Sequence, residues 1–325
     1  IDSANSTITV KYPISTLVSL NQHSAECIKI LEREAKIIGV EQYVADKTEY
    51  FPDLSKLPVV KSGNDCDFEK ILSLQPEVAI AYGWNGAISS SIEYKKSLEP
   101  HVTVIGLNLY QPNNIPQEMA QLGYLMGNPE RAYEFIDFYE SYLDTIEEKA
   151  SQIPEDQRIR VYLERNSDFS TAGEGSGLGD MCAMAGGDNI ALGLAGTSST
   201  VDPEWVIQEN PDAIVKTANH GNKYMGYEKE NSTDARDLRE AIMNRTGWKN
   251  IKAVQDDRVF MLSDSVVGKP NFFIGVAYLA KFFYPDQFAD LDPQAIHQEY
   301  LTRFQRLDFN LNEKGVFAYP LPEES

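Results

Sequence analysis

Short apolar runs rich in β-branched residues alternate with stretches of helical spacing along the first half of the chain. The runs predict buried strands, and they cover residues 14–20, 36–40, 78–82 and 102–106. The helical stretches cover residues 26–38, 67–74 and 89–98. A strand–helix–strand rhythm of this kind is typical of a mostly parallel sheet with helices on both faces.

A long helix is predicted in the middle of the chain. Asn128 and Pro129 form a favourable helix start, apolar residues then recur at helical spacing, and Pro154 ends the pattern. A helix that runs to about residue 152 is on the order of 35 Å long. We therefore expect it to join two lobes rigidly.

The second half of the chain repeats the alternation. Strands are predicted at residues 158–163, 213–215 and 258–262, and helices begin at 181 and 204 and cover 272–283. The predicted fold class is α/β, with two Rossmann-like lobes and a single long connecting helix. The predicted domains are an N-terminal lobe at 1–128, the helix at 129–153 and a C-terminal lobe at 154–325. Ligands of such sheets bind beyond the carboxyl ends of the strands, which predicts a cleft between the lobes.

Composition excludes several classes of partner. The net charge of −20 over 325 residues argues against binding to nucleic acid or to an anionic lipid surface. Cys27, Cys66 and Cys182 form no CxxC pair, so we expect buried thiols. The four histidines show no metal-ligand spacing, so no metal site is predicted. The chain begins at Ile1 without an initiator Met, and we expect that a signal or lipid-anchor segment has been removed.

Four sequence blocks carry a family resemblance. Residues 67–78 and 201–215 each combine an acidic helix start with a Pro–acidic pair before an apolar strand, residues 185–191 read Ala-Gly-Gly-Asp-Asn-Ile-Ala, and residues 248–260 run from Trp through Ala-Val to Arg-Val-Phe. In order and spacing, from about residue 14 to 305, the chain resembles the class III periplasmic binding proteins. These serve ABC importers of iron siderophores, haem and vitamin B12. Asp257 stands where the family has Gly.

The resemblance implies two lobes with a small hinge motion, and a membrane permease with its ATPase as partners. In the family, one glutamate on each lobe pairs with permease arginines, and the matching positions here are Glu69 and Glu204. Two fixed negative points set the docking register on a two-fold permease. The alternative is that both are ordinary glutamates on helix surfaces.

Loops after the predicted strands supply the candidate ligand-binding residues. These are Asn21, Gln22, Tyr50, Trp84, Asn85 and Tyr110 in the first lobe, and Arg165, Ser176, His220 and Lys269 in the second. Trp84 lies in a glycine-flanked loop and offers a flat apolar face to a ligand, or else packs as a lid on its own lobe. Arg165 pairs with a ligand carboxylate or phosphate, or bridges Glu164 or Asp168 at the surface.

Two of these positions have open alternatives. His220 could reach a metal or a polar ligand edge, although a lone histidine more often does neither. Ser176 belongs to the glycine-rich stretch 173–179, which has neither of the common nucleotide-binding spacings. We expect this stretch to be a flexible loop whose backbone N–H groups contact the ligand.

These observations predict a monomeric, extracytoplasmic receptor that delivers a metal chelate or corrinoid to an ABC importer permease. It has no catalytic residues and no cofactor of its own. The aromatic and amide groups among the candidates suit a corrinoid or a hydroxamate chelate best, and haem less well. Two alternatives stay open. A chelatase or nitrogenase-like metallocofactor protein would need several thiolate ligands, and a receptor for a free metal ion would need several histidines on facing loops.

Overall fold

The chain forms two compact units in the computed structural model, which describes residues 2–3, 7–83, 88–218 and 223–321. Unit 1 comprises residues 1–138 with 303–307, and unit 2 comprises residues 139–302 with 308–325. The chain passes from unit 1 to unit 2 within helix α6 (Pro129–Ser151). Each unit contains one sheet with helices, so the predicted α/β class with two lobes is confirmed.

Unit 1 is built on a six-stranded sheet with the order β4-β3-β2-β1-β5-β6. The strands are β1 (Leu17–Ser19), β2 (Ile37–Glu41), β3 (Val59–Ser62), β4 (Asp65–Cys66), β5 (Val78–Tyr82) and β6 (Thr103–Leu107). All neighbours pair in parallel except β3 with β4. The carboxyl ends of β1, β2, β3, β5 and β6 therefore share one edge of the sheet.

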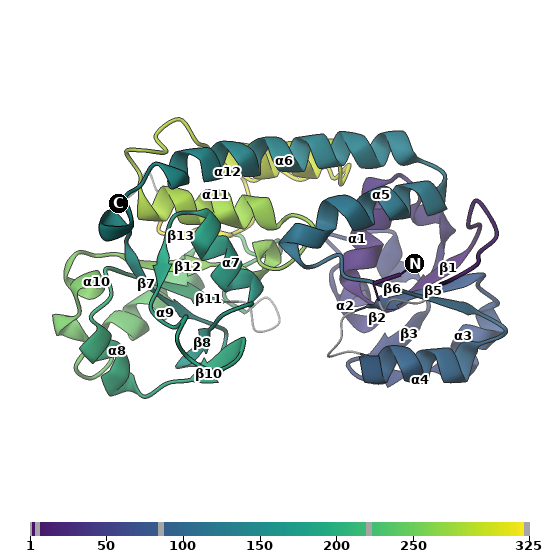
Figure 1. The fold of residues 1–325 in the computed structure, drawn as a ribbon, viewed down its shortest axis with the longest axis horizontal. Helices are drawn as coiled ribbons and strands as arrows, with labels where there is room; N and C mark the ends of the chain where they lie inside the picture. The colour runs from purple at the N-terminus through teal and green to yellow at the C-terminus, as the bar shows by residue number, and fades with distance from the viewer. Residues whose placement is uncertain (1, 4–6, 84–87, 219–222, 322–325) are drawn as a thin grey trace. The chain divides into compact units, whose positions relative to one another are not determined.

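Helices cover both faces of this sheet. Helices α1 (Gln22–Ile30) and α5 (Ile115–Met126) lie on one face, and α3 (Phe68–Leu74) and α4 (Ile88–Leu98) lie on the other (Figure 1). A short helix, α2 (Gln42–Asp46), follows β2. Val18, Val60, Ile71 and Val104 belong to a buried core that joins the sheet to the second pair of helices.

The helix predicted at residues 26–38 is wrong in both of its boundaries. Helix α1 begins earlier, because Asn21 caps it by accepting a hydrogen bond from the Ser24 backbone N–H. It also ends earlier, at Ile30, and Glu32 adopts a left-handed backbone with φ of 57°. The β-branched residues Ile37 and Ile38 then begin β2, because packing in the sheet prevails over helical spacing.

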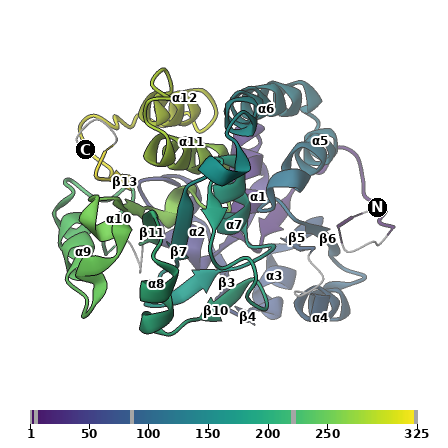
Figure 2. The same cartoon turned by 60° about the vertical axis from the view of Figure 1, so that its left-hand side comes forward.

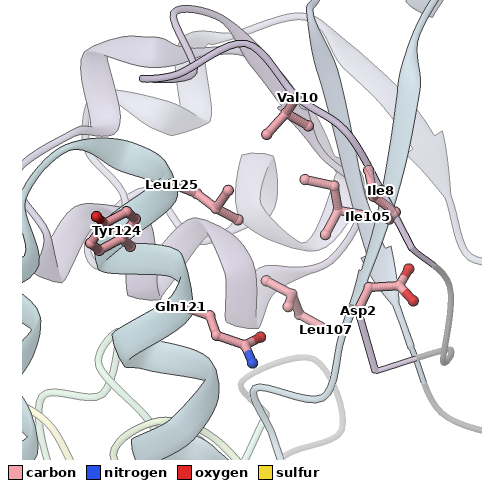
Figure 3. Close-up of a pocket in the computed structure, with 8 residues that line it drawn as sticks. All are labelled: Asp2, Ile8, Val10, Ile105, Leu107, Gln121, Tyr124 and Leu125. Carbon is pink, nitrogen blue, oxygen red and sulfur yellow. The ribbon is translucent and has the colours of Figure 1, made fainter.

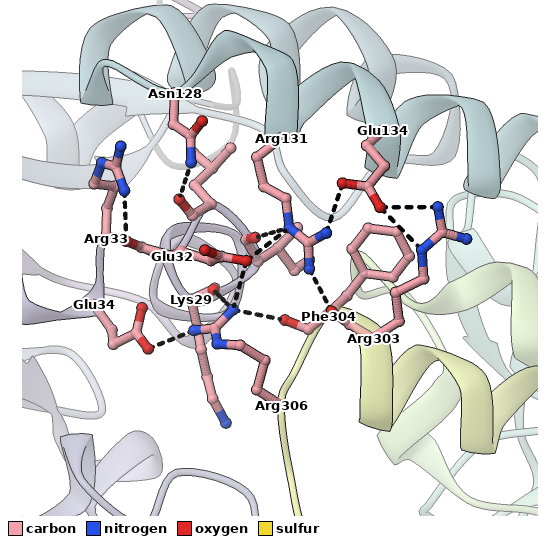
Figure 4. A network of polar contacts seen from close by, with 12 residues as sticks. Lys29, Glu32, Arg33, Glu34, Asn128, Arg131, Glu134, Arg303, Phe304 and Arg306 are labelled. Atoms are coloured by element: carbon pink, nitrogen blue, oxygen red, sulfur yellow. Dashed lines mark hydrogen bonds and ion pairs between the residues drawn. The ribbon is translucent and has the colours of Figure 1, made fainter.

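The segment 303–307 is bound firmly within unit 1. The guanidinium of Arg306 donates to the carbonyl oxygen of Lys29 over 2.9 Å. Arg131, near the start of α6, lies over the ring of Phe304 with 4.6 Å between the guanidinium carbon and the ring centroid. Figure 4 shows Arg131 and Arg306 among several glutamates around this segment. The C-terminal part of the chain therefore contributes to unit 1 as well as to unit 2.

Unit 2 is built on a seven-stranded sheet with the order β10-β8-β7-β11-β12-β13, and β9 pairs with β7 beside this path. The strands are β7 (Arg160–Glu164), β8 (Ser170–Ala172), β9 (Asp188–Asn189), β10 (Ser198–Thr200), β11 (Ala213–Thr217), β12 (Val259–Leu262) and β13 (Ala318–Tyr319). Strands β7, β11 and β12 are parallel, so Glu164, Thr217 and Leu262 mark one edge of the sheet.

Two groups of helices pack around this second sheet. Helices α11 (Phe272–Phe283) and α12 (Pro293–Arg303) lie on one side of β7, β11 and β12, and α8 (Pro203–Glu209) and α9 (Thr233–Met243) lie on the other (Figure 2). The remaining helices are α7 (Gly177–Met184) and α10 (Lys252–Gln255). Among the described residues, we find no helix with the length and apolar character needed to cross a bilayer.

Candidate functional site

The first candidate residues of unit 1 lie where β1 passes into α1. The side chain of Asn21 is buried, and its Oδ1 is used as the helix cap, 2.9 Å from the Ser24 backbone nitrogen. Gln22 is the first residue of α1 and is partly exposed. Asn21 therefore fixes the local backbone, and Gln22 remains accessible at the carboxyl edge of the sheet.

Three aromatic rings meet at the same edge. The ring of His23 lies 5.7 Å from that of Tyr82 and 5.8 Å from that of Tyr110, and the two tyrosine rings contact edge to face at 5.5 Å. Tyr82 ends β5, and Tyr110 follows β6, so adjacent parallel strands bring them together. Both tyrosines are partly exposed. We call these three residues the ring group.

Helix α5 adds a buried carboxylate near the ring group. Burial raises the pKa of Glu118 to about 7, and the hydrogen bond from the Ser3 hydroxyl and the charge of Asp2 act in opposite directions on it. Its Oε2 atom has no hydrogen-bond partner in the described structure. Burial likewise raises the pKa of Tyr110 to about 12, with the charge of Glu118 as the second cause.

The other candidates of unit 1 are not all brought into the ring group. Tyr50 is only 5% exposed, and its hydroxyl donates to Glu26 Oε1 over 2.6 Å. The ring of Tyr50 contacts Phe51 edge to face at 4.8 Å. Trp84 and Asn85 lie outside the described residues. Of the six candidates, the structure thus brings Tyr110 to the ring group and places Gln22 beside His23.

In unit 2, Arg165 directly follows β7 and is exposed. Its backbone nitrogen donates to the carbonyl of Ser170 over 2.7 Å and closes a hairpin between β7 and β8. Ser176 caps α7, with its hydroxyl oxygen 3.1 Å from the Gly179 nitrogen, which is why that helix begins at Gly177 rather than at the predicted residue 181. Lys269 is buried before α11, and His220 lies outside the described residues.

A charged network missing from the predictions lies at the carboxyl ends of β7 and β11. Glu164 accepts from Lys216 Nζ over 2.8 Å and from both terminal nitrogens of Arg245 over 2.7 and 2.8 Å. Asp168 Oδ1 lies 3.1 Å from Lys216 Nζ and 2.9 Å from Arg245. Glu164 and Asp168 are therefore paired with these two cations, rather than with Arg165 as one alternative had it. We call these four residues the charged network.

The two predicted docking glutamates occupy equivalent positions. Glu69 and Glu204 are each the second residue of a seven-residue helix, α3 and α8, and both are exposed. Each helix has an aspartate as its N-cap, Asp67 or Asp202, and ends in a left-handed residue. The repeated geometry presents one carboxylate in the first turn of a matching helix in each unit.

Two cavities formed by the described residues lie elsewhere. One of about 320 Å³ in unit 1 is bounded by the N-terminal stretch, β6 and α5, and Figure 3 shows its lining of Ile8, Val10, Ile105, Leu107, Leu125, Tyr124, Gln121 and Asp2. Another of about 190 Å³ in unit 2 lies between residues 230–232 and 311–321. Neither is lined by a predicted ligand residue. No group of three or more His, Cys, Asp or Glu suited to a metal ion occurs among the described residues.

A family model described as periplasmic binding protein matches residues 17–266. The chain therefore belongs to the periplasmic binding protein family, and the predicted class III membership is confirmed. The three curated relatives named below are all named as binding proteins.

Three curated relatives share most of their length with the chain. The uncharacterized ABC transporter substrate-binding lipoprotein YvrC of Bacillus subtilis is 28% identical over 295 residues, which cover 89% of this chain and 86% of YvrC. The molybdate-binding protein MolA of Haemophilus influenzae is 22% identical over 340 residues (95% and 91%). The vitamin B12-binding protein of Vibrio cholerae is 22% identical over 265 residues (80% and 85%).

Solved structures share the fold. The TroA-like periplasmic binding protein FepB of Veillonella parvula matches with a TM-score of 0.81 and 24% identity, over 98% of this chain and 97% of FepB. MolA bound to molybdate matches with a TM-score of 0.77 and 21% identity, over 95% and 98%. The relatives differ in ligand, so the ligand of this chain has to be argued from its own residues.

Proposed function

We propose that this chain is the extracytoplasmic receptor of an ABC importer, that it acts as a monomer, and that it captures a corrinoid or another metal chelate. The ring group carries the ligand proposal. Tyr82 and Tyr110 are partly exposed aromatic residues at the carboxyl edge of a parallel sheet, where ligands of such sheets bind. Trp84, Asn85, Arg165, His220 and Lys269 belong to the same proposal as further contacts.

Membership of the family supports this role, and so do the names of two relatives. YvrC is named as an ABC transporter lipoprotein, and the Vibrio cholerae protein is named for vitamin B12. MolA, named for molybdate, introduces a free oxyanion as a second ligand class. The cations of the charged network, Lys216 and Arg245, favour testing that class beside the chelates.

A ligand titration tests the proposal. Purified protein is titrated by calorimetry with cobalamin, cobinamide, a ferric hydroxamate, a ferric catecholate, haemin and molybdate. We expect micromolar or tighter binding of one class, and about tenfold weaker binding by Tyr110→Ala because a stacking face is lost. Tyr133→Ala is the matched control, since that ring is 58% exposed on α6, outside the ring group. Equal affinities of the two variants would remove the ring group from the site.

The permease contact is tested separately. We propose that Glu69 and Glu204 pair with cationic residues of the permease, as fixed charges on the surface of each unit. Glu69→Arg and Glu204→Arg should each weaken binding to the reconstituted permease and its ATPase at least tenfold, without changing ligand affinity. Glu130→Arg, in the exposed first turn of α6, is the control. If the double variant that combines Glu69→Arg and Glu204→Arg still binds the permease as wild type does, docking through these glutamates is excluded.

A further inference from the structure

The buried part of the charged network carries more positive than negative charge. The side chains of Lys216 and Glu164 are 2% and 1% exposed, and that of Arg245 is 14% exposed. Among the described residues, Glu164 is the one buried carboxylate paired with these two cations, and it also accepts a hydrogen bond from the Tyr162 hydroxyl over 3.2 Å. One positive charge is thus left over. Because an uncompensated buried charge is costly, the site requires a second anion.

Asp168 supplies that anion from an exposed hairpin. Its Oδ1 contacts both cations, yet its side chain is 65% exposed. Burial acts to raise the pKa of Asp168, but Lys216 and Arg245 outweigh burial and hold that pKa below its ordinary value. The second anion is therefore largely solvated, unlike Glu164.

The two cations are held in place independently of Asp168. The guanidinium of Arg245 lies 4.6 Å from the ring centroids of both Phe169 and Trp248, and its two terminal nitrogens hold Glu164. Lys216 is the fourth residue of β11 and also bonds Glu164. A planar guanidinium and an ammonium fixed side by side match the oxygens of a phosphate or similar anion.

We propose that Lys216 and Arg245 form an anion subsite of the ligand-binding edge of unit 2, which Asp168 occupies in this structure and which an anionic oxygen group of the ligand takes in exchange. The inference rests on the proposed function, because it assumes that ligand binds at the carboxyl ends of the strands. One anion replaces another, so the charge of the buried part stays balanced. The Asp168 carboxylate, whose side chain is already 65% exposed, then moves fully into water.

The ligand chemistry is a phosphate or oxyanion, and it has two possible sources. Cobalamin carries a phosphodiester in its nucleotide loop, cobinamide lacks that loop, and molybdate is a free oxyanion. A subsite for a ligand phosphate favours cobalamin over cobinamide. A subsite for a free oxyanion favours molybdate over both corrinoids.

The test compares Asp168→Asn with wild type and with Asp237→Asn. Asp237 is a matched control, because it is 61% exposed in unit 2 and pairs with Arg236. Calorimetry is run with molybdate, inorganic phosphate, cobalamin and cobinamide. Asp168→Asn removes the carboxylate that competes with the ligand for Lys216 and Arg245. It should therefore tighten the binding of molybdate, phosphate or cobalamin about threefold to tenfold, and leave the affinity for cobinamide unchanged. Lys216→Met added to Asp168→Asn should abolish the gain, and circular dichroism confirms that each variant is folded.

The outcomes separate the subsite from the wider function. If Asp168→Asn binds none of the anions more tightly than Asp237→Asn, the subsite is overturned, even where wild type binds a chelate well. If Asp168→Asn gains affinity for molybdate or phosphate while wild type binds no corrinoid or chelate, the subsite stands and the ligand class proposed above is overturned. A gain for cobalamin without one for cobinamide assigns the subsite to the nucleotide phosphate.

Discussion

The carboxyl edges of the two sheets carry different chemistry. In unit 1, the rings of His23, Tyr82 and Tyr110 lie beside Glu118, a carboxylate that has no charged hydrogen-bond partner among the described residues. In unit 2, Glu164 is as deeply buried but is held by two cations. Rings accept many flat ligands, whereas fixed charges select by sign and geometry. Under the proposals above, we therefore expect the edge of unit 1 to favour flat groups and the edge of unit 2 to favour anionic ones.

The largest effect expected from this contrast is on the stability of unit 2. Glu164→Gln leaves Lys216 and Arg245 with Asp168 alone, and removing one partner of a buried ion pair costs about 3–5 kcal/mol. We expect the free energy of unfolding to fall by that amount. In a Trp84→Phe background, urea unfolding followed by the fluorescence of Trp205 and Trp248 reports on this unit.

A partly exposed ion pair in the same unit provides the control for Glu164. Glu209 pairs with Arg160 over 2.6 Å, but its side chain is 34% exposed. Glu209→Gln should change the free energy of unfolding by no more than about 1 kcal/mol. If Glu164→Gln is equally mild, Asp168 alone suffices for both cations, and the charge imbalance that defines the subsite is not present.

The second effect is the pH dependence that the buried carboxylate of unit 1 gives to stability. Burial raises the pKa of Glu118 from 4.5 to about 7 in the folded protein. Between these values the folded chain holds the proton and the unfolded chain has lost it, so this group's contribution to stability falls as pH rises and is constant above about pH 7. From pH 4.5 to 8, wild type should lose about 2–3 kcal/mol relative to Glu118→Gln.

Urea unfolding of both proteins at pH 5, 6, 7 and 8 measures this difference directly. Glu130→Gln, at an exposed helix position, should follow the wild-type profile. Parallel profiles for wild type and Glu118→Gln would mean that the carboxyl group is ionised at all four pH values. Glu118 would then be a buried charge across this pH range, and this part of the contrast between the two units would disappear.

Sequence patterns predicted the fold better than the site, for a physical reason. Strands such as β5 and β11 are local apolar runs, and their parallel order follows from the alternation with helices. The charged network depends on contacts between residues far apart, since Lys216 and Arg245 lie 52 and 81 residues from Glu164. A lysine inside the apolar run of β11 was the available signal, because a buried cation requires a partner.

Tyr82 and Glu118 illustrate the same limit in unit 1. Tyr82 is the last residue of a correctly predicted strand, but only the pairing of β5 with β6 brings its ring to Tyr110. Glu118 lies one turn into α5 and reads as an ordinary helical glutamate until the packing of α5 buries it. A single sequence gives residue types and periods, whereas burial and partners follow from tertiary structure.

The smallest effect concerns a feature that the two units share. Asp67 caps α3 through a 2.9 Å hydrogen bond from the Lys70 nitrogen, and Asp202 caps α8 through a 2.8 Å bond from the Glu204 nitrogen. Asp67→Ala and Asp202→Ala should each cost about 1 kcal/mol, because an N-cap is lost in each unit. Hydrogen exchange of the α3 and α8 amides localises the two effects.

Matched losses would show that the two helices are equivalent in energy as well as in position, which is what a pair of docking points on separate units requires. Asp→Asn at the same two positions is the control, since asparagine caps a helix about as well as aspartate. Asp202→Ala could instead lower the free energy of unfolding several times more than Asp67→Ala does. Helix α8, which begins at Pro203, would then depend on its N-cap more than α3 does. Glu69 and Glu204 would then lie on helices of unequal stability. Glu69→Arg and Glu204→Arg should in that case weaken permease binding to unequal extents, in the same order.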